Sequence, residues 1–311
     1  MQQGGAINIQ SNYSIRVMFE RCLFDHCIAF SNTIGGGGIY FSATQGSICL
    51  SQVCGYDCYV NNDKPGQFAS LIVGASNNLV LTLLSMSQCA PISSLRNSAI
   101  NLENGNQTFN NLNISRGYTS LIAGMRIFGV ICCNAKYCTM ANNCASSSQL
   151  IYFDSPSSLP GKFEYFNVIA NQSPLLSIIY LYVPANYLNL YYGLFYNNEV
   201  NLFGIKSGSC LLFLYHSLVF SPIMTSFTTV TSSNCTIISS EVPTYKFSHF
   251  STYMCYNKDI IDLLNECNVP HPSVFPSPTE CIFGSNDGQS SISIVNLFQI
   301  AMCAATLIIG Q

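Results

Sequence analysis

The stretch "CLFDHCIAFSNTIGGGGIYF", residues 22–41, places two cysteines five positions apart, then four glycines, then an apolar-aromatic triplet. Glycine reaches positive φ without steric cost, so the glycine run predicts a sharp backbone turn before a buried strand. Cys22 and Cys27 are expected at the two ends of a short strand and its corner, stacked near Cys49 and Cys54 of the following coil. We interpret the stretch as one coil of a repeated structure.

Three short patterns recur along the chain. A Cys-x4-Cys pair occurs at residues 22–27, 49–54 and 133–138, an Asn pair closes residues 59–62, 140–143 and 195–198, and glycine precedes an apolar strand at residues 4–9 and 35–41, with a worn copy at 97–102. These patterns predict structural cysteines at Cys22, Cys27, Cys49, Cys54, Cys133 and Cys138, and coil-turn residues at Gly4, Gly5, Gly37, Gly38, Asn61, Asn62, Asn142, Asn143, Asn197 and Asn198.

Short apolar runs, broken by Gly, Asn, Ser and Pro, indicate strands rather than helices over most of the chain. Aligning them predicts coil starts near residues 15, 47, 79, 107, 130, 161, 187, 209 and 234, at intervals of 22 to 32 residues. A repeated turn signature favours a parallel solenoid over a sandwich or barrel, with asparagine amides stacked between coils. The sequence therefore predicts an all-β parallel β-helix of roughly eight to ten irregular coils over residues 1–253.

Two motifs support a family resemblance. "GGAI" at Gly4–Ile7 and "FYNN" at Phe195–Asn198 are similar to the paired GGAI and FxxN signatures of the polymorphic outer membrane protein type of β-helix. Over about residues 4–250 the chain resembles cysteine-rich members of that type in parasitic protists such as trichomonads. The resemblance implies a right-handed parallel β-helix displayed on a cell surface, often with adhesive roles, and implies no particular binding site.

The composition excludes some function classes. Hydrophobic residues make up 49% of the chain and charged residues 8%, so the chain has a large apolar core and an exterior of Ser, Asn, Thr and Gln. Only 11 Lys and Arg accompany a net charge of −3, and no basic stripe is present. Nucleic-acid binding, which depends on clustered Lys and Arg, is therefore not expected.

Cysteine content and sequons indicate the secretory route. The 16 cysteines are several times a typical cytosolic share, and oxidising compartments tolerate such usage best. Candidate N-glycosylation sites are Asn12, Asn106, Asn113 and Asn234, and a fifth sequon at Asn171 is compromised by Pro174. Residues 1–20 contain no recognisable signal peptide, so we interpret the start of the chain as the middle of a repeat.

The texture of the sequence changes after residue 253. Residues 254–290 are rich in Cys and Pro, which predicts a disulfide-pinned cap or stalk that uses Cys255, Cys267 and Cys281. A metal site that adds His271 to these cysteines matches no zinc-binding spacing. No cofactor or metal is therefore expected.

Residues 291–311 are expected to form a transmembrane helix or an anchor signal. Residues 292–310 carry no charge, and 19 residues of helix reach about 28 Å, close to the thickness of a bilayer core. Two alternatives stay open. The segment is either a lipid-anchor signal that is removed or a buried last element of the solenoid.

The acidic residues offer one candidate catalytic pair. Asp25 and Asp57 lie 32 residues apart, about one coil, so that stacking can bring their carboxylates together. Glycoside hydrolysis needs two such carboxylates, although solvated corner residues explain the pair as well. Cys27 beside His26 offers a nucleophile and a base, but adjacent strand residues face opposite sides, which favours a buried structural thiol.

We therefore expect a non-enzymatic, membrane-anchored surface protein that acts in adhesion or as an antigen. Its partner would be a host-cell or extracellular-matrix protein or glycan, with the membrane contacted through residues 292–310. The alternative is a β-helical carbohydrate-binding or carbohydrate-active module of the pectin-lyase-like kind. A third hypothesis is a decayed repeat fragment that folds poorly because its first coil has no cap.

Overall fold

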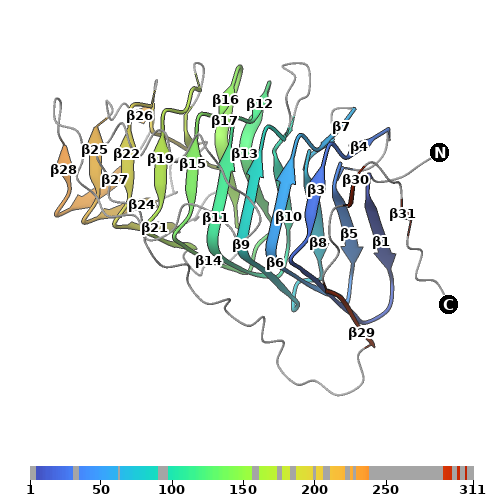
Figure 1. The fold of residues 1–311 in the computed structure, drawn as a ribbon. Coiled ribbons are helices and arrows are strands. Elements are labelled where there is room, and N and C mark those ends of the chain that lie inside the picture. Colours follow the sequence, from blue (N-terminus) through green and yellow to red (C-terminus); the bar gives the residue numbers. More distant parts are fainter. Residues whose placement is uncertain are drawn as a thin grey trace.

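The computed structural model describes residues 5–30, 35–61, 64–89, 97–155, 161–173, 177–182, 187–198, 201–205, 211–220, 225–226, 229–237, 290–295, 300–301 and 305–306. These residues form short strands that stack in parallel as a β-solenoid, as Figure 1 shows. The predicted all-β parallel solenoid is therefore confirmed. Its right-handedness and its total of eight to ten coils stay predictions.

One wall of the solenoid is a ten-stranded sheet. Its strands, in spatial order, are β26 (Thr225–Ser226), β23 (Phe203–Ile205), β20 (Ile179–Leu181), β17 (Gln149–Asp154), β13 (Ile122–Phe128), β10 (Ile100–Glu103), β8 (Ala69–Val73), β5 (Ile39–Ala43), β1 (Ile7–Ser11) and β31 (Ala305–Thr306).

The remaining walls form a second, sharply bent sheet. Its strands are β2 (Ile15–Glu20), β3 (Leu23–Asp25), β6 (Ser47–Tyr56), β9 (Asn78–Ser87), β11 (Asn106–Ser115), β14 (Cys132–Lys136), β15 (Thr139–Ala141), β18 (Gly161–Glu164), β19 (Asn167–Ile169), β21 (Tyr187–Tyr191), β22 (Leu194–Tyr196), β24 (Leu211–Tyr215), β25 (Leu218–Phe220), β27 (Thr229–Ser233), β28 (Thr236–Ile237), β29 (Ser290–Val295) and β30 (Ile300–Ala301). Two small sheets pair β4 (Ile28–Ala29) with β7 (Tyr59–Val60) and β12 (Tyr118–Thr119) with β16 (Cys144–Ala145).

The glycine-before-strand repeat lies in register on the ten-stranded sheet. Ile7 pairs with Ile39, Ile39 pairs with Ala69, and Ala69 pairs with Ile100. The three predicted copies therefore stack on one another. A fourth copy, "GQFASL" at 66–71, is not recognisable from the sequence. Gln67 and Phe68 replace the small residues that precede the strand in the other copies.

Close backbone approach, more than turning, explains the glycines. Within residues 35–38 only Gly36 has a positive φ, of 85°. A Cβ on Gly5 would collide with the carbonyl of Gly37, and a Cβ on Gly38 would lie 2.7 Å from the ring of Phe68. The expected turn with positive φ is therefore found at Gly36, and the other glycines of the run make room for the neighbouring coil.

Two columns of residues with positive φ form the corners of the coils. Corner A comprises Arg21, Gln52, Leu83, Asn111, Tyr137, Tyr165, Tyr192, His216 and Asn234, and corner B comprises His26, Asp57, Gln88, Arg116, Asn142, Ala170 and Asn197. Left-handed backbone costs a residue other than Gly about 1–2 kcal/mol. The neighbouring coil offsets that cost, because the corner N–H donates to a carbonyl there, as from Tyr165 to Tyr191 at 2.9 Å and from Asn142 to Ile169 at 3.1 Å.

Buried asparagines follow corner B and form the expected ladder. The Oδ1 atom of Asn171 accepts from the backbone N–H and the Nδ2 of Asn143, at 2.9 and 3.0 Å. The Oδ1 atom of Asn198 accepts from the same two groups of Asn171, at 3.0 and 3.1 Å. The structure therefore places Asn142 and Asn197 at this corner, each followed by a ladder asparagine, Asn143 and Asn198.

Asn61 of the third Asn pair does not belong to the ladder. Asn61 is exposed and follows β7, four positions after the corner B residue Asp57, and Asn62 lies outside the described residues. Its place in the column is taken by Cys58. Asn171, in contrast, is a full ladder member that sequence patterns present only as a sequon.

The Cys-x4-Cys pairs do not stack as a structural repeat. Cys54 pairs with Leu23, and Cys133 pairs with Gln107. The prediction that the three pairs repeat one another is therefore wrong. The real regularity is that a cysteine follows a corner residue, as Cys22 follows Arg21.

The predicted neighbours of the first cysteines are confirmed in part. β3 lies between Cys22 and Cys27, as expected. The backbone N–H of Cys54 donates to the carbonyl of Cys22 at 2.9 Å, so these two cysteines are neighbours. Cys27 lies over Cys58 instead, because the N–H of Tyr59 donates to the Cys27 carbonyl at 3.0 Å.

The described part of the C-terminal segment consists of strands. β29 pairs with β2, β30 with β3 and β31 with β1, all in parallel, so this segment adds strands to the first coil (Figure 1). The helix expected over residues 292–310 is thus not found in these strands, which match the alternative of a last solenoid element. No helix long and apolar enough to cross a membrane occurs in the part of the chain that the structure describes. Residues 254–289, with their three predicted cysteines, lie outside that part, as does Gly4.

We predict that Asn171→Ala lowers the free energy of unfolding by about 2–4 kcal/mol, because two buried donors on Asn143 lose their acceptor. Asn61→Ala, at an exposed position, should change it by less than about 0.5 kcal/mol. Urea unfolding followed by circular dichroism measures both. Equal effects of the two substitutions would contradict the ladder.

Candidate functional site

Coil stacking brings the predicted carboxylate pair together at corner B. Asp25 pairs in register with Tyr56, which places Asp25 and Asp57 on adjacent coils. His26 lies between them, with Nδ1 2.6 Å from Asp25 Oδ1 and Nε2 3.4 Å from Asp57 Oδ2. The ring of Tyr56 packs edge-on against the imidazole, 5.6 Å away between centroids.

This arrangement is an electrostatic clamp on an exposed imidazole. A protonated His26 donates from both ring nitrogens, one to each carboxylate. Its side chain is 54% exposed, so the ion pairs contribute little to stability. Each carboxylate has an oxygen directed at the imidazole, and a glycosidase mechanism would need the two to face a bound sugar. The geometry brings the pair together without itself assigning a reaction.

The thiol next to His26 points the other way. Cys27 is 4% exposed, and its Sγ donates to the carbonyl of Asp25 at 3.6 Å. Hydrogen bonding to Cys58 and then burial raise the pKa of the Cys27 thiol well above its ordinary value. A raised pKa keeps the thiol protonated, so it does not serve as a nucleophile activated by His26.

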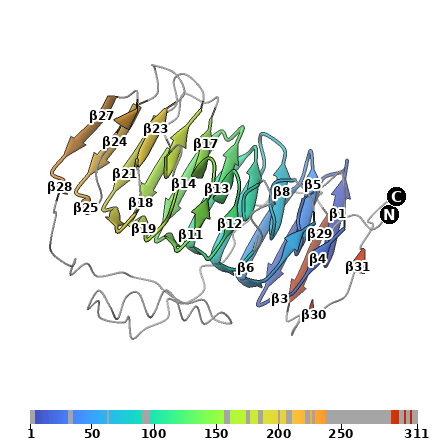
Figure 2. The same cartoon turned by 90° about the horizontal axis from the view of Figure 1, so that it is seen from above.

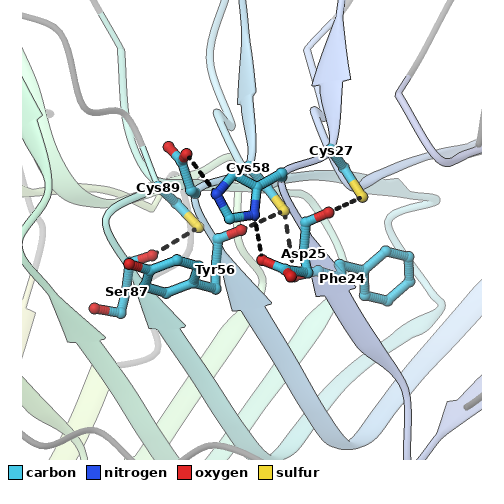
Figure 3. Close-up of polar contacts among 9 residues, drawn as sticks. Phe24, Asp25, Cys27, Tyr56, Cys58, Ser87 and Cys89 are labelled. Carbon is cyan, nitrogen blue, oxygen red and sulfur yellow. Dashed lines mark hydrogen bonds and ion pairs between the residues drawn. The ribbon is translucent and has the colours of Figure 1, made fainter. Parts of the chain in front are cut away.

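Three buried thiols follow the corner B residues of successive coils, and Figure 3 shows Cys27, Cys58 and Cys89 in one row. Cys58 Sγ donates to the carbonyls of Phe24 and Tyr56, at 3.4 and 3.2 Å. Sequence patterns missed Cys58 and Cys89, although the signal was present. The three cysteines follow one another at intervals of 31 residues, one coil length.

Most described cysteines fill the core as thiols. Cys49 and Cys54 are disulfide-bonded. Free thiols occur at Cys58, Cys89, Cys132, Cys133, Cys138 and Cys235. Burial is the main cause that raises the thiol pKa values of Cys58, Cys133 and Cys138, the last to about 12. Cysteine content is therefore a weaker sign of an oxidising compartment than the sequence alone indicated, because thiols here act as small apolar side chains.

A second candidate surface is a column of rings at corner A. Tyr137 stacks on Tyr165, Tyr165 on Tyr192, and Tyr192 on His216, with centroid distances of 4.9, 5.0 and 5.4 Å and interplanar angles of at most 20°. Tyr191 and Tyr215 make a parallel stack beside it, at 4.7 Å. The column runs along β14, β18, β21 and β24, which follow one another along the solenoid in Figure 2.

Two lysines flank the rings. Lys136 and Lys162 lie 2.9 and 2.8 Å from the two carboxylate oxygens of Glu164, and Lys162 also lies 5.3 Å from the ring centroid of Tyr191. Burial by itself raises the pKa of Glu164, but hydrogen bonds from Lys162 and Lys136 outweigh it and lower the net pKa. The surface therefore combines aromatic edges, hydroxyls and two cations.

A third polar cluster lies on the ten-stranded sheet. Arg126 Nη1 donates to Glu103 at 2.7 Å and to Asn101 at 2.8 Å, and its guanidinium lies 4.6 Å from the ring centroid of Phe128. Burial raises the pKa of the neighbouring Tyr152. Because these groups satisfy one another's hydrogen-bonding capacity, we interpret the cluster as a set of cross-strand contacts that stabilise the sheet. Sequence patterns missed it, since its members come from separate strands.

The candidate glycosylation sites differ in exposure. Asn12 and Asn234 are exposed, and Asn106 is half-buried in β11. Asn113 is fully buried in the same strand, so the folded chain has no room for a glycan there. That prediction is wrong, because the sequon lies in a buried polar row where Asn113 pairs with Thr139. Asn171 is fully buried as well.

The predicted metal ligands Cys255, Cys267, His271 and Cys281 lie outside the described residues. Among the residues that the structure does describe, no group of three or more His, Cys, Asp or Glu side chains is arranged to hold a metal ion.

Comparison of the chain with protein-family models, curated proteins and solved structures finds no match. The resemblance to the polymorphic outer membrane protein type therefore stays a prediction that rests on the motifs.

Adjacent cysteines provide a test of the buried thiols. Cys133 is 1% exposed with a raised pKa, whereas Cys132 is partly exposed. Thiol alkylation proceeds through the thiolate. We predict that iodoacetamide labels Cys132 at least about tenfold faster than Cys133 in the native protein at pH 8. Peptide mass spectrometry measures the two rates, and equal native rates would contradict the inward orientation of Cys133.

Proposed function

We propose that the chain is a non-enzymatic β-helical protein displayed on a cell surface, where it acts in adhesion or as a surface antigen. Its partner would be a host-cell or extracellular-matrix protein or glycan. The observation that carries this proposal is the column of stacked rings at corner A, made by Tyr137, Tyr165, Tyr192 and His216.

The stack suits recognition because it is pre-ordered. Each corner tyrosine is held by its own backbone hydrogen bond to the neighbouring coil, as from Tyr192 to Tyr215 at 3.0 Å. A side chain that is already ordered loses little entropy on binding. Tyrosine also combines apolar area with a hydroxyl, which is why it is enriched in binding surfaces.

The spacing of the column favours an extended partner. Rings stacked face to face turn their edges outward, so the column offers ring edges and hydroxyls at the strand spacing of about 4.8 Å. Lys136 and Lys162 lie beside these groups. A glycan chain or an extended peptide that runs along the solenoid would meet the same group on each coil.

Surface display requires attachment to a membrane, which has its own test. Membrane attachment through residues 292–310 competes with the pairing of β29 with the first coil. A carbonate-washed membrane pellet from cells that express the chain behind a secretion signal separates the two. A pelleted chain supports an anchor, and a soluble chain overturns it.

A specific observation also favours the carbohydrate-active alternative. Stacking places Asp25 and Asp57 on either side of His26. In that alternative, loss of these two carboxylates removes saccharide binding or turnover.

The double variant Tyr165→Asn and Tyr192→Asn tests the proposal. Asparagine tolerates the left-handed corner conformation, and this column already uses it at Asn111 and Asn234. We expect adhesion of beads coated with the variant to host-cell monolayers to fall at least about tenfold, equivalent to ~1.4 kcal/mol.

The matched control is Gln88→Asn with Arg116→Asn, at positive-φ positions of corner B that lie outside the ring column. It should leave adhesion unchanged. Equal losses from both double variants, or no loss from either, would remove the ring column as the contact surface. A loss confined to Asp25→Asn with Asp57→Asn would favour the carbohydrate-active alternative.

A further inference from the structure

We propose that Cys58 is the shared partner of an inter-coil disulfide, which it forms with Cys27 or with Cys89, one at a time. The thiol column at corner B is then a redox modification site that locks neighbouring coils to one another.

The register places the three sulfurs one above another. β4 pairs with β7 so that Ile28 lies opposite Tyr59, which sets Cys27 opposite Cys58. The N–H of Asp57 donates to the carbonyl of Ser87 at 3.1 Å, which sets Cys58 opposite Cys89. Residues opposite one another on paired strands have Cα atoms about 4.8 Å apart, inside the range of about 4.4–6.8 Å that disulfides span.

The three sulfurs also lie in one row. Each Sγ donates to the carbonyl two residues earlier in the chain, at 3.6, 3.2 and 3.5 Å for Cys27, Cys58 and Cys89. Figure 3 shows Cys58 between the other two sulfurs. Because Cys58 lies in the middle and can form only one S–S bond, the column holds one disulfide and one remaining thiol.

The thiols occupy the position that amides occupy farther along the solenoid. Cys58 Sγ donates to Phe24 of the preceding coil and to Tyr56 two residues earlier. Asn171 Nδ2 makes the same two kinds of contact, with Met140 and Ile169. Stacked amides hold neighbouring coils together by hydrogen bonds alone, whereas stacked thiols can also form a covalent disulfide between coils.

The oxidation is a thiol–disulfide exchange with a small-molecule disulfide such as oxidised glutathione. The Cys58 thiolate attacks one sulfur and releases one small thiolate, leaving a mixed disulfide. The Cys27 or Cys89 thiolate then attacks the Cys58 sulfur and releases the second. Two protein thiols and one small disulfide become one protein disulfide and two small thiols, with the two protons passing to the released thiolates.

Burial sets when the exchange takes place. Cys58 is fully buried, and its pKa is raised chiefly by that burial, so few thiolates form in the closed coil. Exchange therefore proceeds rapidly while the coils assemble and slowly once they have closed.

The test maps disulfides in the full-length chain. Denatured, reduced protein is refolded in glutathione buffer at several redox ratios, quenched with acid, alkylated and digested for mass spectrometry. We expect peptides that join Cys58 to Cys27 or Cys89. The same buffer added to folded protein should give these peptides at least about tenfold more slowly.

Three variants make the result specific. Cys27→Ser should shift all linkage to Cys58–Cys89, Cys89→Ser should shift it to Cys27–Cys58, and Cys58→Ser should abolish both. Cys138→Ser, at a buried position that follows corner A, is the matched control and should leave the linkage unchanged.

Measurements on the wild-type chain by themselves can contradict the proposal, so the test does not depend on whether the cysteine variants fold. The proposal is wrong if refolded wild-type protein contains Cys58 as an unbonded thiol, recovered in alkylated form, at redox ratios where Cys49 and Cys54 are disulfide-bonded. It is also wrong if Cys58 is joined mainly to cysteines outside the column.

Discussion

The hydrogen bond from each left-handed corner to the next coil is the contact on which the rest of this structure depends. A corner residue with positive φ is strained unless its N–H finds an acceptor, and the carbonyl that precedes the next corner supplies it, as Tyr137 finds Glu164. One such bond fixes which residue lies above which. Once the register is set, the residues at equivalent positions of successive coils form columns along the solenoid.

Each column then has its own chemistry, which depends on whether its side chains point out of the solenoid or into it. Where the corner residue is at least partly exposed, it produces the stacked rings of Tyr165 and Tyr192 and the clamp around His26. Gln52, Leu83 and Asn111 of corner A are buried instead. The residue after the corner points inward, which produces the thiols of corner B and the amides of Asn143 and Asn171. The outer columns can meet a partner, while the inner columns hold the coils together.

The sequence predicted what depends on local pattern. Glycine or another small residue before an apolar strand identified stacked positions such as Ile7, Ile39 and Ile100, because at Gly5 and Gly37 the neighbouring backbone leaves no room for a Cβ. One coil length between Asp25 and Asp57 was enough to predict their meeting. The expected helix at the C-terminus rested on apolar length alone, and length does not distinguish a membrane helix from strands that cover a solenoid end.

The features that the sequence did not predict are columns of residues on successive coils, which no contiguous motif marks. Cys-x4-Cys is a contiguous pattern, yet Cys22 and Cys133 occupy different columns. The thiols 31 residues apart occupy one column without any shared flanking residues. The ring column was hidden for the same reason, since Tyr137, Tyr165 and Tyr192 are neighbours only after the coils stack. A search by coil period would have found both sets, although the period varies too much for a fixed interval to succeed throughout.

The most direct measurement is residue-resolved hydrogen exchange of the corner amides in the native protein. If corner bonds set the register, the amides of Tyr137, Tyr165, Asn142 and Ala170 exchange at least about 10³-fold more slowly than those of Ala75 and Ser76, which lie in an exposed turn. Rapid exchange at the corners, together with protected strands on either side, would contradict the account. The strands would then stack without the corners holding them.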